Sequence, residues 1–184
     1  MECQIIISRH LGLNICQFSG VKESENDVTS IDAKTTMHNG QLIEKASVTG
    51  IQFFNSDLEE IPSAIFDEEN FKNIVSLRLD GGSLKYVNKD NFEDASKLRV
   101  LEIFNSQIHE ISSQAFKFAE SLEEIIIKDS TIERIDEEAF IGLKKLKKLQ
   151  LVNCNYPNNH FFKHIPKRFK SILLTADQWS VEWN

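Results

Sequence analysis

The chain has 184 residues, of which 41% are hydrophobic and 27% are charged, and its formal net charge is −7. This length suffices for one domain with a core of useful size. The negative charge disfavours nonspecific attraction to nucleic acid and to anionic membranes, because both need a basic protein face. No apolar run is long enough to span a bilayer, so membrane insertion is not expected.

Residues 1–47 are predicted to form an N-terminal cap that begins with a hairpin. Two short strands, residues 3–7 and 11–18, flank a turn and would place Cys3 opposite Cys16. Two interpretations stay open: a disulfide that contributes roughly 3 kcal/mol, or two reduced thiols in a cytosolic protein. No signal peptide precedes Cys3, so a secreted protein would require this chain to be the mature form with a replacement Met.

Residues 48–153 carry a repeated pattern of six apolar positions. One unit is Leu98, Leu101, Ile103, Ile108, Ile111 and Phe116, and the same six positions return 24 residues later as Leu122, Ile125, Ile127, Ile132, Ile135 and Phe140. The first unit, which begins at Val48, is expanded by two residues within 67–73. This period and order are typical of a leucine-rich repeat solenoid.

The predicted fold class is therefore an α/β solenoid with a parallel concave sheet and about five to six repeats of 24 residues. Inward and outward side chains alternate along each short strand. A lone repeat cannot bury its apolar face, but stacked neighbours can. One Phe per repeat is expected to stack in a column inside the convex wall, namely Phe66, Phe92, Phe116 and Phe140.

Position nine of each unit, counted from the first apolar residue, usually holds an Asn that bonds turn amides. Here it holds Ser56, Gly82, Ser106, Ser130 and Cys154. Serine can still satisfy a turn amide, whereas glycine has no side chain to do so, so Gly82 is predicted to be the weakest member of this ladder. Cys154 is interpreted as a buried free thiol, with an intermolecular disulfide as the alternative.

Residues 154–184 depart from the repeat pattern. Phe169, Ile172 and Leu174 reproduce the spacing of a last strand, and Trp179, Val181 and Trp183 alternate behind it. We expect a C-terminal cap in which the tryptophans cover the final strand. The alternative is an exposed aromatic docking surface.

Binding residues are expected on the concave face, at the outward positions of the strands. Position seven of the repeat unit faces solvent, yet it holds the aromatic residues Phe54 and Phe104. Position five beside it adds the charged residues Arg78 and Glu102. Exposed aromatic residues flanked by a few charges are typical of protein-binding hot spots. The predicted binding residues are Phe54, Arg78, Glu102, Phe104, Ile126 and Lys128. The alternative is that a loop covers these apolar residues or that they are merely tolerated.

No pattern indicates catalysis, a metal or a cofactor. His160 and His164 stand four apart without a third ligand, whereas a metal site needs three or four. No nucleophile elbow, phosphate loop or dinucleotide fingerprint is present. The basic run from Lys144 to Lys148 is interpreted as a solvated edge.

The phased repeats with Phe in the return path, preceded by the segment with Cys3 and Cys16, resemble extracellular leucine-rich repeat proteins of arthropods. The resemblance is to the short leucine-rich immune proteins of mosquitoes and to Toll-like ectodomains, and it covers residues 48–153. It implies secretion and non-catalytic recognition of another protein or a microbial surface component. The chain lacks the heptads and the double-cysteine motif of the mosquito proteins, so complement-like complex formation is not implied.

Two functions therefore remain under consideration. The first is a secreted recognition module, in innate immunity, that binds through its concave face. The second is an intracellular structural scaffold with reduced cysteines. The redox state of Cys3 and Cys16 distinguishes these two functions.

Overall fold

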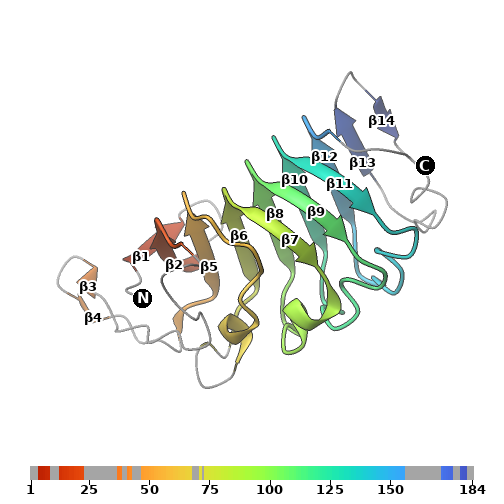
Figure 1. Ribbon diagram of the computed structural model, residues 1–184. Helices are drawn as coiled ribbons and strands as arrows, with labels where there is room; N and C mark the ends of the chain where they lie inside the picture. Colours follow the sequence, from red (N-terminus) through yellow and green to blue (C-terminus); the bar gives the residue numbers. More distant parts are fainter. Residues whose placement is uncertain are drawn as a thin grey trace.

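The computed structural model describes residues 4–8, 13–22, 37–38, 41–42, 47–67, 71, 73–155, 171–175 and 179–181. Within these residues the chain forms a solenoid whose turns stack side by side along one axis (Figure 1). The predicted parallel-strand solenoid is therefore confirmed.

Nine described strands form the main sheet. In spatial order they are β1 (Gln4–Ser8), β2 (Leu13–Ser19), β5 (Gly50–Phe54), β6 (Ser76–Asp80), β8 (Val100–Phe104), β10 (Glu124–Lys128), β12 (Lys148–Val152), β13 (Ser171–Thr175) and β14 (Trp179–Val181). The strands from β2 to β13 pair in parallel. The outer strands β1 and β14 pair antiparallel with their neighbours, so a hairpin closes each end of the parallel sheet.

The repeat period sets the register of this sheet. Gly50 lies opposite Ser76, and Ser76 lies opposite Val100, so equivalent repeat positions always face each other. The two extra residues of the first unit are absorbed outside the strands, since the 26-residue step from Gly50 to Ser76 leaves the pairing unshifted. The inward apolar residues of β5, β6, β8, β10 and β12, such as Leu101 and Ile103, are at most 1% exposed.

A second parallel sheet of three described strands runs along the solenoid, formed by β7 (Ser83–Val87), β9 (Gln107–Ile111) and β11 (Thr131–Ile135) (Figure 1). Sequence reasoning missed it. The buried residues of β9 are Ile108 and Ile111, three apart, with His109 and Glu110 between them on the outer side. This spacing does not follow the two-residue alternation by which strands are usually recognised.

The return path contains short 3-10 helices, η3 (Ser63–Phe66) and η4 (Lys89–Phe92). No α-helix occurs among the described residues, and no described helix is long and apolar enough to cross a membrane. The predicted aromatic column is present, with ring centres 6.2 Å apart for Phe66 and Phe92, 5.4 Å for Phe92 and Phe116, and 5.6 Å for Phe116 and Phe140.

The position-nine serines form the expected ladder. The hydroxyl of Ser106 donates to the carbonyls of Phe104 and Gly81, at 2.8 and 3.0 Å. The backbone N–H of Ser106 in turn donates to the hydroxyl of Ser130 at 3.1 Å. Cys154 is buried and free, and its thiol donates to the carbonyl of Ile127 at 3.3 Å.

The two ends of the chain are described in part. The hairpin of β1 and β2 is present, and a further two-stranded sheet joins β3 (Met37–His38) to β4 (Gln41–Leu42). Cys16 is disulfide-bonded. Cys3 lies outside the described residues, so its pairing with Cys16 stays a prediction. The division of the chain into an N-terminal cap (1–47), repeats (48–153) and a C-terminal segment (154–184) also stays a prediction.

At the C-terminal end, the predicted last strand is β13, in which Ile172 lies opposite Leu149 and Leu174 lies opposite Leu151. Phe169 and Trp183 lie outside the described residues, as does the side chain of Trp179. The covering role of the tryptophans therefore stays a prediction.

Candidate functional site

The concave face carries all six predicted binding residues on adjacent strands of the main sheet. Phe54 is 46% exposed and Lys128 is also exposed, while the other four are half-buried, namely Arg78, Glu102, Phe104 and Ile126. They face outward because they alternate with the buried residues of the same strands, as in the order half-buried, buried, half-buried along β8.

The sheet register arranges these residues in two rows across the strands. One row runs from Gln52 through Arg78 and Glu102 to Ile126. The second row runs from Phe54 through Asp80 and Phe104 to Lys128. Phe54 and Phe104 are therefore separated by the strand that carries Asp80.

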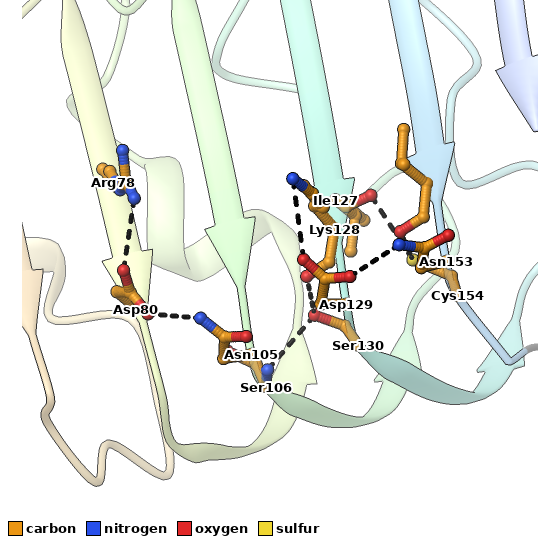
Figure 2. A network of polar contacts seen from close by, with 11 residues as sticks. Arg78, Asp80, Asn105, Ser106, Ile127, Lys128, Asp129, Ser130, Asn153 and Cys154 are labelled. Carbon is orange, nitrogen blue, oxygen red and sulfur yellow. Dashed lines mark hydrogen bonds and ion pairs between the residues drawn. The ribbon is translucent and has the colours of Figure 1, made fainter. Parts of the chain in front are cut away.

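Arg78 links the two rows. Its guanidinium carbon lies 4.3 Å from the centre of the Phe104 ring, a cation–π arrangement. Nη2 of Arg78 donates to Oδ2 of Asp80 at 3.2 Å, and the other carboxylate oxygen of Asp80 accepts from Nδ2 of Asn105 at 2.7 Å (Figure 2). The guanidinium is thus held in one orientation by a stacked ring and a charged hydrogen bond.

Asp80 and Asn105 complete this cluster, which we call the Arg78 cluster (Arg78, Asp80, Phe104 and Asn105). Asp80 and Asn105 are not among the six predicted binding residues, although the repeat pattern gives both of them outward positions. A signal for Asn105 was available: position eight holds only residues that tolerate positive φ, namely Asn55, Gly81, Asn105, Asp129 and Asn153. Their φ angles lie between 48° and 95°.

A similar polar contact lies farther along the same edge. Asn153 donates from Nδ2 to Oδ1 of Asp129 at 2.8 Å, and Nζ of Lys128 lies 3.8 Å from the other carboxylate oxygen of Asp129 (Figure 2). Asp129 and Asn153, the left-handed residues after two neighbouring strands, therefore contact each other through their side chains. This contact orders the edge of the face that carries Lys128.

Glu102 is the acidic residue beside the Arg78 cluster. Burial raises the pKa of its carboxyl group, while the positive charges of Arg78 and Lys148 oppose that rise. The concave face thus presents an oriented cation, a neighbouring carboxylate and apolar surface within a few strands. This combination can recognise a complementary surface through contacts and charge, and it needs no bond-making chemistry.

Carboxylates near the start of the strands are paired with basic residues from neighbouring repeats. Nε of Arg99 and Nζ of Lys147 donate to the two carboxylate oxygens of Glu123, at 2.8 and 2.6 Å. Glu124 and Lys148 form a further pair at 3.2 Å. Among the described residues, no group of three or more His, Cys, Asp or Glu side chains is arranged to hold a metal ion, and His160 and His164 lie outside those residues.

The pairing of Glu123 predicts a stability change in acid. The hydrogen bonds from Arg99 and Lys147 lower the pKa of Glu123 to about 2, below its value of about 4.3 in an unfolded chain. The stabilisation is therefore present above the unfolded pKa and is lost as the pH falls toward 2. Urea unfolding should show that Glu123→Gln narrows the stability difference between pH 6 and pH 3 by about 0.3–1 kcal/mol, a small effect because the side chains of Arg99 and Lys147 are exposed. An unchanged pH dependence in this variant would contradict the assignment.

Comparison with known proteins finds a family match in part of the repeat region. Residues 96–155 match the family described as leucine rich repeat. The chain is 30% identical over 106 residues to leucine-rich repeat-containing protein 3B of Bos taurus, Mus musculus and Homo sapiens, a match that covers 57% of this chain and 39% of those proteins. The matched part thus spans about two fifths of the length of these relatives.

Two solved structures are similar in outline. Internalin C2 from Listeria monocytogenes has 15% identity and a TM-score of 0.45, and the match covers 71% of this chain and 62% of that chain. A complex of TLR13 with ssRNA13 has 16% identity and a TM-score of 0.46, with 70% of this chain and 25% of that chain covered.

Proposed function

We propose that this chain is a leucine-rich repeat protein that acts as a non-enzymatic binding module and recognises another protein through its concave face. The observation that carries the proposal is the Arg78 cluster. A guanidinium that is stacked on Phe104 and held by Asp80 loses little conformational entropy when a partner contacts it. Pre-ordered arginine and aromatic side chains are the residue types that dominate interface energies.

The surroundings of the cluster support a protein partner. Phe54 is the most exposed large hydrophobic side chain in the described part of the chain, at 46%. Ile126 adds half-buried apolar surface one strand beyond Glu102. Apolar and charged residues thus alternate across this face, and protein interfaces likewise combine apolar contacts with polar ones.

The cellular setting is a further part of the proposal. The resemblance to secreted arthropod immune proteins, together with the disulfide-bonded state of Cys16, supports an extracellular protein of innate immunity that binds a protein or a microbial surface component. A disulfide persists in oxidising compartments and is rare in the cytosol. The intracellular scaffold with reduced cysteines is therefore less well supported.

The test is a paired alanine variant, Phe54→Ala with Phe104→Ala, compared with the unaltered protein in partner capture. Proteins retained by the unaltered chain should bind the double variant at least about 30-fold more weakly, since two aromatic hot-spot residues contribute about 2 kcal/mol or more. Both side chains point away from the core, so the unfolding midpoint should change little.

Tyr86→Ala is the matched control. Tyr86 is 41% exposed but lies on β7 of the second sheet, where its ring contacts His109 edge-on. This control variant should retain the captured proteins. A captured partner that binds the Phe54 and Phe104 double variant with unaltered affinity would rule out the concave site.

A further inference from the structure

We propose that the solenoid has a second binding site, a cleft in its return path that takes an acidic and aliphatic segment of a partner protein. The cleft has a volume of about 340 Å³ and lies between the return paths of two successive repeats. Lys117 and Glu120 come from one repeat, and Ile141, Gly142, Lys144 and Lys145 come from the next. None of these residues belongs to the concave face.

The hollow has a cause in the repeat sequence. Residues 94, 118 and 142 are 24 apart and occupy the same place in successive repeats, where the chain holds Asp94, Phe118 and Gly142. Gly142 therefore has no side chain at the place where the preceding repeat has the ring of Phe118. The space beside it is open, because a Cβ built on Gly142 would meet no atom within 4 Å.

The cleft is positively charged although the chain as a whole is acidic. Three lysines face one glutamate in the cleft, whereas the formal net charge of the chain is −7. Lys147 and Lys148 of the same basic run are paired with Glu123 and Glu124. Among the described residues, Lys117 and Lys144 form no ion pair with a carboxylate. Their charges are therefore available to an incoming anion.

An apolar side chain lies beside these charges. Ile141 is 39% exposed, which makes it one of the few large hydrophobic residues of the described chain that face solvent. The ligand that complements this site carries carboxylates next to an aliphatic group, as an acidic peptide segment does. A nucleic-acid backbone fits less well, because it needs a continuous basic track, whereas the cleft offers three lysines beside the exposed Ile141.

The test uses a short blocked peptide of alternating glutamate and leucine, titrated into the labelled protein and followed by NMR. The amide signals of Ile141 and Gly142 should shift in a saturable manner, and the affinity should fall as salt is added. The double variant Lys144→Gln with Lys145→Gln should bind the peptide about fivefold more weakly, which corresponds to the loss of two exposed charge contacts.

Lys97→Gln is the matched control. Lys97 occupies the repeat place of Lys145, 48 residues earlier. Each of these lysines donates to a side chain 24 residues before it, Lys97 to Asn73 at 3.1 Å and Lys145 to Ser121 at 3.3 Å. Lys97 lies outside the cleft, so its replacement should leave the titration unchanged.

Three results would overturn the proposal. The first is an equal response to a peptide in which glutamine replaces glutamate. The second is a Lys144 and Lys145 double variant that binds the peptide no more weakly than Lys97→Gln does. The third is tighter binding of a short oligothymidylate, which would mark the cleft as a nucleic-acid contact. None of these results bears on the concave face.

Discussion

Replacing Phe116 with alanine is expected to lower the free energy of unfolding by about 3–5 kcal/mol. Phe116 is 1% exposed and lies within the aromatic column, with Phe92 at 5.4 Å on one side and Phe140 at 5.6 Å on the other. Its removal leaves a cavity between two repeats. Because each repeat is stabilised mainly by its neighbours, the loss also weakens the coupling along the array.

Thermal unfolding followed by circular dichroism measures this effect. The midpoint should fall by on the order of 10 °C for a chain of this size, and the transition should broaden as the repeats on either side uncouple. Phe118→Ala is the control, because Phe118 is only half-buried and its ring contacts Lys117 instead of the column. Equal losses in the two variants would show that the column has no special role.

Replacing Gly82 with alanine is expected to cost about 2–4 kcal/mol. Two effects add: the left-handed backbone at φ 103° disfavours any Cβ, and the neighbouring repeat leaves no room for one. A Cβ on Gly82 would lie 3.0 Å from both the N and the O of Leu58 and 3.2 Å from the carbonyl of Ser56. Urea unfolding gives the difference in free energy directly.

Gly142→Ala separates these two effects. Gly142 also has positive φ, at 92°, but a Cβ added there would have no atom within 4 Å. Its substitution should therefore cost only the conformational part, about 1–2 kcal/mol. If both variants lose the same amount, the close approach of the two repeats at Gly82 contributes nothing.

The structure also refines the prediction for Gly82. As expected, Gly82 adds no side chain to the position-nine ladder. However, the adjacent backbone of Ser56 and Leu58 crowds the place where the Cβ of a serine would stand. The gap in the ladder thus coincides with a close approach of two neighbouring repeats.

The sequence predicts which residues lie on the outer face of the main sheet, but it does not predict how their side chains contact one another. Strand alternation and the 24-residue period place Arg78 and Phe104 on the outer face from sequence alone. Their cation–π contact depends on the side-chain conformations across two strands. The role of Asp80 depends on Asn105, which comes from the next repeat 25 positions later.

The sequence by itself determined the repeat period, the buried positions, the strand register and the aromatic column. It could do so because a solenoid makes its contacts between equivalent places of adjacent repeats. Residues that are one repeat length apart in the sequence are therefore neighbours in the structure. Only the tertiary structure decided the second sheet, the Arg78 cluster, the close approach at Gly82 and the hollow beside Gly142. The second sheet pairs equivalent places of successive repeats, but its buried residues are three apart and do not show the alternation of a strand. The other three features arise where neighbouring repeats differ from one another, and they depend on the shapes of the side chains and turns that meet there.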